Sequence, residues 1–237
     1  MRILITGGSR GIGRALVERF STPENKVAFI YRSSHAEAKA LADACGAIAI
    51  CADLSDGKVA KVATEEAISR LGGIDVLINN AGISQIKMFT DITDEDWQTM
   101  MDTNLSSVFY VTRAALPSMV SQKSGRIINI GSMWGKVGAS CEVHYSATKA
   151  GIRGLTMALA KEVGPSGITV NAIEPGVIKT DMCASLDQST ISELCDETPL
   201  CRLGTPEDVA NTAYFLASEG ASFITGQIIG VDGGFAV

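Results

Sequence analysis

Residues 6–13 read TGGSRGIG, a glycine-rich turn between an apolar run at residues 3–6 and an amphipathic stretch at residues 11–20. In dinucleotide-binding folds such glycines allow a tight turn, admit a pyrophosphate close to the backbone and let the next helix pack on the strand. The N–H groups that open this helix then face the phosphates. A plain tight loop is the alternative interpretation, but the position directly after a first strand favours a nucleotide site.

The alternation of short β-branched runs with longer helical patterns continues to the end of the chain. Strands are predicted at residues 3–6, 26–31, 47–51, 74–78, 125–130, 168–172 and 227–231, and helices at residues 11–20, 36–45, 55–71, 94–121, 145–163 and 206–217. Strands that are apolar at nearly every position are covered on both faces. The sequence therefore predicts a three-layer, doubly wound α/β Rossmann fold with a seven-stranded parallel sheet, in one domain over residues 1–237. The polar, broken stretch at residues 176–204 is a candidate lid over a substrate.

Composition excludes several classes of protein. With 237 residues and 46% hydrophobic residues the chain can bury a core, which disordered chains cannot. A net charge of -6 argues against nucleic-acid binding. No apolar stretch approaches the about 20 residues that span a bilayer, and no leader segment is evident. The 6 cysteines form no Cys-x-x-Cys pair and the 2 histidines add no zinc spacing, so we expect no metal site, reduced thiols and a cytoplasmic location.

The end of the second predicted strand indicates which cofactor the site prefers. An acidic residue there would bind the ribose 2′-hydroxyl of NAD, whereas this chain has Tyr31, Arg32 and Ser33. Arg10, in the glycine turn, is expected on the same side. Guanidinium groups and hydroxyls suit a 2′-phosphate, so NADPH is favoured over NADH. The alternative is that the arginines are only solvated surface residues.

Tyr145 and Lys149 are one helical turn apart and are expected on the same face of a helix. A free tyrosine titrates near about 10, and a neighbouring ammonium lowers that pKa toward the working pH. This spacing predicts that Tyr145 acts as a general acid when a hydride from nicotinamide reduces a carbonyl.

The chain resembles the short-chain dehydrogenases/reductases of the single-domain type almost from end to end. The shared features are residues 6–13, Asp53, the NNAG run at residues 79–82, Asn104, Ser132, Tyr145 with Lys149, Pro175 with Gly176, and the VDGG run at residues 231–234. The resemblance implies that Ser132 hydrogen-bonds the substrate carbonyl, that Lys149 also holds the nicotinamide ribose, and that Asn104 orders a water that returns the proton to Tyr145.

The resemblance also assigns the cofactor contacts. Asp53 and Leu54 are expected at the adenine, Asn79 and Gly82 at the adenosine side, and Ile178 and Thr180 at the nicotinamide carboxamide. The full set expected to bind the cofactor is Gly7, Ser9, Arg10, Gly11, Ile12, Gly13, Tyr31, Arg32, Ser33, Asp53, Leu54, Asn80, Ala81, Gly82, Tyr145, Lys149, Pro175, Gly176, Ile178 and Thr180.

Over its whole length the chain is most similar to 3-oxoacyl-(acyl-carrier-protein) reductases, which implies fatty-acid synthesis and an acidic carrier protein as partner. Such a partner calls for basic residues near the cleft, for which Lys123 and Arg126, just before the fifth strand, are candidates, whereas the turn at residues 164–167 has none. A non-catalytic sensor or scaffold that binds NADPH is a remote alternative, because the residues of the catalytic relay are all present.

Residues 133–144 depart from those reductases and resemble a subgroup that reduces 5-aminopentanone attached to elongation factor P. Glu142 could pair with an ammonium of such a substrate, and Trp134 could add a cation–π wall. The alternative is that Glu142 is a surface residue that caps the helix containing Tyr145. Met182 is a further candidate for the substrate wall. His144 is interpreted as structural, and the apolar circumference of the long helices predicts a homotetramer.

Overall fold

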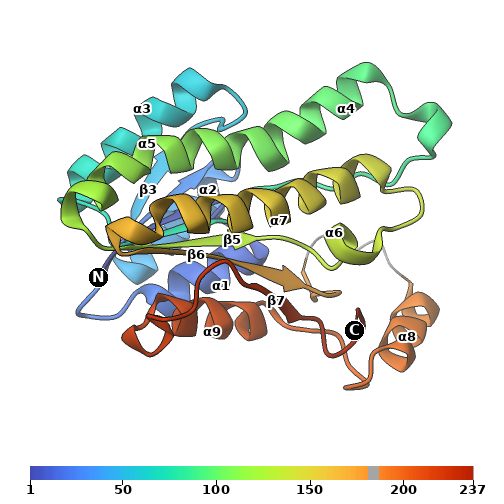
Figure 1. The fold of residues 1–237 in the computed structure, drawn as a ribbon. Coiled ribbons are helices and arrows are strands. Elements are labelled where there is room, and N and C mark those ends of the chain that lie inside the picture. Colours follow the sequence, from blue (N-terminus) through green and yellow to red (C-terminus); the bar gives the residue numbers. More distant parts are fainter. Residues whose placement is uncertain (181–186, 237) are drawn as a thin grey trace.

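The computed structural model describes residues 1–180 and 187–236. Seven parallel strands form one sheet in the order β3-β2-β1-β4-β5-β6-β7 (Figure 1). The strands are β1 (Arg2–Thr6), β2 (Lys26–Tyr31), β3 (Ile48–Cys51), β4 (Val76–Asn79), β5 (Gly125–Ile130), β6 (Ile168–Pro175) and β7 (Ile228–Val231). The predicted doubly wound fold is therefore confirmed.

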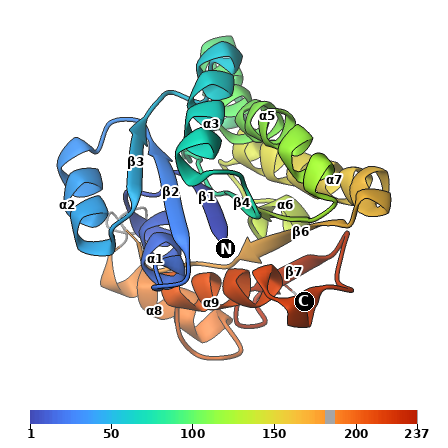
Figure 2. The same cartoon turned by 90° about the vertical axis from the view of Figure 1, so that its left-hand side faces the viewer.

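Helices cover both faces of the sheet, which gives three layers (Figure 2). On one face lie α1 (Gly11–Phe20), α2 (His35–Cys45) and α9 (Pro206–Ala217), and on the other α3 (Gly57–Leu71), α5 (Ser107–Gln122) and α7 (Val143–Val163). Three further helices, α4 (Asp94–Met101), α6 (Trp134–Val137) and α8 (Gln188–Glu197), lie beyond the carboxyl ends of the strands.

The core follows from the alternation of side chains along each strand. Ile3 and Ile5 pack in the cluster that α1 and α9 cover, whereas Leu4 packs in the cluster under α3 and α5. All three side chains are fully buried. Because both faces of β1 are covered, the strand is apolar at successive positions, as the sequence indicated.

The long helix predicted at residues 94–121 is interrupted. Helix α4 ends at Met101, a π-helical turn follows over Asp102–Ser106, and α5 begins at Ser107. A π-turn inserts extra backbone into a helix and often marks a functional position. Here it carries Asn104, so the interruption lies at the expected catalytic relay.

Two short helices were not predicted. Helix α6 follows Ser132 directly, and α8 lies inside the stretch that looked too broken for structure. Asp187 starts α8, since its carboxylate accepts a hydrogen bond from the Thr190 N–H at 2.8 Å. Strand β6 is also longer than predicted, because it continues to Pro175.

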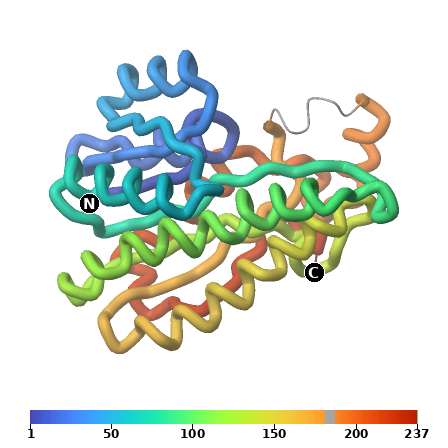
Figure 3. Tube along the Cα trace, turned by 90° about the horizontal axis from the view of Figure 1, so that it is seen from above, coloured from blue at the N-terminus to red at the C-terminus, as the bar shows by residue number. Residues whose placement is uncertain are grey.

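The chain begins at the amino ends of the strands, and its last described residues lie toward their carboxyl ends (Figure 3). The segment after β7 turns back toward α6. There the rings of Trp134 and Phe235 pack edge to face, with their centroids 5.9 Å apart. Within residues 1–180 and 187–236, no helix is long and apolar enough to cross a membrane.

Candidate active site

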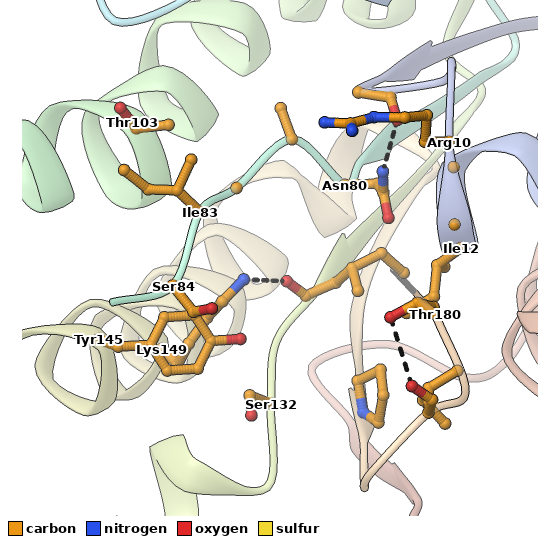
Figure 4. Close-up of a pocket in the computed structure, with 18 of the residues that line it drawn as sticks. Arg10, Ile12, Asn80, Ile83, Ser84, Thr103, Ser132, Tyr145, Lys149 and Thr180 are labelled. Carbon is orange, nitrogen blue, oxygen red and sulfur yellow. Dashed lines mark hydrogen bonds between the residues drawn. The ribbon is translucent and has the colours of Figure 1, made fainter. Parts of the chain in front are cut away.

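A cavity of about 770 Å³ lies at the carboxyl ends of the central strands (Figure 4). Parallel α/β sheets bind ligands at this edge, where the strand order reverses between β1 and β4. Every residue of the full set expected to bind the cofactor lines the cavity, and so do Ser132, Trp134 and Glu142, whereas Asn79 does not. The structure thus brings the predicted residues together, while their individual roles stay predictions. Met182 lies outside the described residues.

The glycine turn forms one end of the cavity. Gly7 and Gly11 have positive φ angles of 67° and 52°, which favour glycine. A side chain at Gly13 would place its Cβ 2.0 Å from the Gly7 carbonyl oxygen. Asn80 holds the turn by donating from Nδ2 to the carbonyl oxygens of Thr6 and Gly7. The close backbone packing therefore explains the glycine at position 13.

The start of α1 faces this turn without a side-chain cap. Its N-cap residue, Arg10, makes no capping hydrogen bond to the helix. The first N–H groups of an α-helix have no partner inside the helix and attract anions. The turn therefore presents backbone donors, together with the Arg10 guanidinium, to a phosphate group.

Arg32, Ser33 and Asp53 also line the cavity. Burial alone would raise the pKa of Asp53, but hydrogen bonds from Ser55 and the charge of Arg32 lower it on balance. The Asp53 carboxylate accepts from the Ser55 N–H at 3.0 Å and from its hydroxyl at 2.7 Å. Asp53 is therefore an ionised, locally anchored carboxylate beside the expected adenine site.

Tyr145, Ser132 and Lys149 gather at the other end of the cavity (Figure 4). Tyr145 and Lys149 come from the first two turns of α7, and Ser132 from the loop after β5. The Lys149 ammonium donates to the Ile130 carbonyl oxygen at 2.9 Å. Burial lowers the pKa of Lys149 to about 8, so the ammonium is still mostly charged at neutral pH.

The expected lowering of the Tyr145 pKa is wrong for this arrangement. Burial raises the pKa of Tyr145 to about 12, a hydrogen bond with Ser132 lowers it, and the charge of Glu142 raises it again. Lys149 Nζ lies 5.6 Å from the centre of the Tyr145 ring and is bound to Ile130 instead. Tyr145 is therefore a protonated phenol at neutral pH, as a proton donor in reduction must be.

Asn104 does not line the cavity. Its Oδ1 accepts from the Ile83 N–H and its Nδ2 donates to the Ile83 carbonyl oxygen, both at 2.8 Å. A Cβ at Gly82 would lie 3.3 Å from Asn104 Oδ1 and 3.7 Å from Lys149 Nζ. The side chain of Asn104 thus fixes the loop after β4 close to Lys149, and its expected role on a water stays a prediction.

The Asn79 side chain does not reach the cofactor end, contrary to expectation. It is buried, and its Nδ2 donates to Thr112 and Asn129 inside the core. Alternation along β4 explains this, because Asn79 belongs to the strand and Asn80 is the first residue after it.

Trp134 and Glu142 line the same cavity as Tyr145, and the charge of Glu142 acts on Tyr145. Among the described residues, no cation or hydrogen-bond donor pairs with the Glu142 carboxylate, and burial raises its pKa. Glu142 precedes α7 but makes no side-chain cap to it. Glu142 thus occupies the N-cap position of α7, as the capping alternative has it, but its side chain forms no hydrogen bond there.

Sequence reasoning missed several residues of the wall. They flank predicted positions or come from elements that were not predicted, and they include Ser55, Ile83, Ser84, Ile86, Thr103 and Leu194. Apart from their proximity to recognised motifs, no sequence signal pointed to them. Among the described residues, no group of three or more His, Cys, Asp and Glu side chains is arranged to hold a metal ion.

Known proteins resemble this chain over nearly its whole length. A family model described as enoyl-(acyl carrier protein) reductase matches residues 7–236. A 3-oxoacyl-[acyl-carrier-protein] reductase of Staphylococcus aureus is 41% identical over 236 residues, which cover 98% of this chain and 96% of that protein. The reductase of the same description from Aquifex aeolicus is 41% identical over 237 residues, with coverages of 98% and 95%.

Solved structures agree with this result. A 3-oxoacyl-[acyl-carrier protein] reductase from Brucella melitensis has a TM-score of 0.92 at 35% identity, covering 100% of this chain and 91% of that one. A putative short-chain alcohol dehydrogenase from Sinorhizobium meliloti has a TM-score of 0.93 at 36% identity, with coverages of 99% and 95%. Fold and site together define a nicotinamide-dependent oxidoreductase that interconverts a carbonyl and an alcohol. The chain belongs to the short-chain dehydrogenase/reductase family.

Proposed function

We propose that the protein is an NADPH-dependent ketoreductase that reduces a 3-oxoacyl thioester carried on acyl carrier protein to the 3-hydroxyacyl product, as in fatty-acid synthesis. The observation that carries the proposal is the joint placement of the glycine turn and of Tyr145, Ser132 and Lys149 in one cavity. The reductases named above act on substrates of this class by their descriptions.

The residues divide the chemistry between them. When bound, the cofactor supplies a hydride to the carbonyl carbon, and the carbonyl oxygen gains negative charge. The hydroxyls of Ser132 and Tyr145 meet this charge, and Tyr145 gives its proton to the oxygen. Lys149, whose ammonium lies 5.6 Å from the centre of the Tyr145 ring, holds the nicotinamide ribose in this proposal. The carbonyl oxygen thus becomes the hydroxyl of a secondary alcohol.

Replacing Arg32 tests the proposed preference for NADPH. Arg32→Ala removes a guanidinium from the end of the cavity where Arg10 and Ser33 also lie. We expect the KM for NADPH to rise about tenfold or more and the KM for NADH to stay within about twofold, because only NADPH carries the 2′-phosphate. Initial rates with each cofactor measure the effect, with Arg14→Ala on the outer side of α1 as control. Equal rises for both cofactors would refute the role of Arg32.

The unpaired carboxylate of Glu142 favours a second candidate function. A cation in the substrate would give this half-buried group the partner that it lacks, and Trp134 lies in the same wall. The second candidate is therefore reduction of an amino-ketone, such as the 5-aminopentanone group on elongation factor P.

One assay separates the candidates. Oxidation of NADPH is followed at pH 7 with an acetoacetyl thioester and with an amino-ketone, using the wild type and Glu142→Gln. Turnover of the thioester, unchanged in the variant, supports the first function. Turnover of the amino-ketone that falls about tenfold or more in the variant supports the second. Failure with both substrates and with simple ketones would favour a non-catalytic protein that only binds NADPH.

We also propose that residues 1–237 act as one NADP-binding domain, with a substrate lid over residues 176–204, in a cytoplasmic homotetramer. Exposed apolar side chains on α5 and α7, Phe109, Val120 and Met157, support association of this chain with further copies of itself.

Within one chain, the basic candidates Lys123 and Arg126 lie at the amino ends of the strands, opposite the cavity. A carrier protein at the cavity would therefore meet them only through a neighbouring subunit.

A further inference from the structure

A fully buried histidine stands next to the catalytic tyrosine. His144 lies in the first turn of α7 with no exposed surface, and its buried Nδ1 has no hydrogen-bond partner among the residues that the structure describes. Its Nε2 lies 2.9 Å from Oε1 of Gln85, in the loop after β4. The proposed reaction makes no use of this histidine.

Gln85 connects His144 to a third element. Its Nε2 donates to Asp96 Oδ1 at 3.1 Å, and Lys87 Nζ lies 2.5 Å from Asp96 Oδ2. Asp96 also belongs to the capping box that starts α4, where it accepts from the Thr93 N–H at 3.0 Å. The side chains of Gln85 and Asp96 therefore join the loop after β4 to the first turns of α4 and α7.

The charge of Asp96 sets the donor and the acceptor in each hydrogen bond that links Asp96, Gln85 and His144. The hydrogen bond from Lys87 contributes most to holding the pKa of Asp96 far below its usual value, so Asp96 is ionised and only accepts. Gln85 must then turn its amide nitrogen to Asp96 and its oxygen to His144. His144 consequently donates from Nε2 and keeps a lone pair on Nδ1. Burial, which is the largest influence, lowers the pKa of His144, so the ring stays neutral.

The neighbours of Gln85 line the cavity. Ser84 and Ile86 line the same cavity as Tyr145, and the side chain of Gln85 between them bonds instead to His144 and Asp96. The Lys87 N–H also donates to the Cys141 carbonyl oxygen at 2.8 Å, just before α7. Glu142 gives α7 no side-chain cap, and these contacts from the loop support its first turn together with the hydrogen bond from the Ala139 N–H to Ser146 Oγ.

We propose that Gln85 is a positioning residue for reduction: through His144 and Asp96 it fixes Tyr145 against the substrate wall formed by Ser84 and Ile86. This inference rests on the proposed ketoreductase function. Misplacing a reacting group by about 1 Å can cost about 100-fold in rate. Gln85 touches neither the cofactor end nor the glycine turn, so its effect should fall on ketone turnover and leave cofactor binding unchanged.

The variant Gln85→Glu tests the positioning role of Gln85. It keeps the size of the side chain and replaces only the amide NH2 group, which donates to Asp96, by a carboxyl oxygen. While protonated, the new carboxyl can donate to Asp96 and accept from His144, as the amide does. Once ionised, it opposes Asp96, and neither Lys87, which is bound to Asp96, nor neutral His144 removes that repulsion. Glu142, which precedes α7, and Tyr145, in its first turn, are titratable groups nearby that are the same in wild type and variant.

We expect kcat/KM for the ketone, relative to the wild type, to fall about tenfold or more between pH 6 and pH 8, while the Kd for NADPH stays within about twofold. Gln98→Glu is the matched control, because Gln98 donates to Asp102 at 2.9 Å on the exposed side of α4. It should follow the wild-type pH profile.

Three further results decide the question. His144→Gln, which keeps a donor for Gln85, should retain more activity than His144→Leu. A flat pH ratio for Gln85→Glu would overturn the proposal, and so would a parallel loss of NADPH binding, which would show a merely structural role. Since wild-type turnover is measured in the same assay, failure of the ketoreductase function itself would be seen separately.

Discussion

Tyr145→Phe should lower kcat for ketone reduction by about 1,000-fold while the Kd for NADPH stays within about twofold. The variant removes only the hydroxyl that gives its proton to the carbonyl oxygen, and the ring keeps its place at the cavity wall. A phenol with a pKa of about 12 is fully protonated at neutral pH, so the wild type always carries the proton that the variant lacks. Stopped-flow NADPH oxidation and a fluorescence titration of NADPH measure the two quantities.

Tyr110→Phe provides the matched control for this experiment. Tyr110 lies on α5, where its ring packs against Gly57 and does not line the cavity. It should retain wild-type kcat. If Tyr145→Phe kept more than about a tenth of the activity, another group would have to supply the proton, and the assignment of the general acid would fail.

Gly13→Ala should abolish NADPH binding, with a Kd at least about 100-fold higher, and lower the free energy of unfolding by about 2–3 kcal/mol. The new methyl group would lie 2.0 Å from the Gly7 carbonyl oxygen and 2.7 Å from Asn80 Nδ2. The backbone oxygen cannot move aside without opening the turn, and Asn80 would lose the hydrogen bonds that hold it. Urea unfolding and an NADPH titration test both effects.

Gly154→Ala is the control for an added methyl group. Gly154 lies within α7 on an exposed position, and a Cβ there would meet no atom within 4 Å. Alanine favours helix over glycine by about 1 kcal/mol, so this variant should be at least as stable as the wild type. A Gly13→Ala protein that bound NADPH normally would show that the turn can relax, contrary to the packing described here.

The strands and most helices could be predicted because their signals are local. Alternation on β1, where Ile3 and Leu4 face opposite clusters, and the glycine turn before α1 both lie within a few residues of sequence. The π-helical turn around Asn104 could not be predicted in this way, because it is set by the contacts of that side chain with Ile83. Helix α8 was missed because its start depends on a single cap, Asp187.

In the site, too, local sequence signals could be interpreted, whereas features that depend on the folded chain could not. Motif residues such as Ser132 and Lys149 were placed in the cavity by sequence alone. The pKa of Tyr145 was misjudged, because spacing on a helix reports a neighbouring charge but not the burial that outweighs it. The contact of His144 with Gln85 spans 59 residues of sequence, so only the folded chain brings the two together.

The sheet order has a consequence for the growing chain on the ribosome. β1 leads the sequence but lies in the interior of the sheet, where it pairs with β2 on one side and with β4 on the other. Until Val76–Asn79 emerges, the edge of Ile3–Ile5 that β4 will cover stays open, and open apolar edges recruit other chains. Nascent chains arrested before β4 should therefore need a chaperone, and synthesis past Asn79 should release that need.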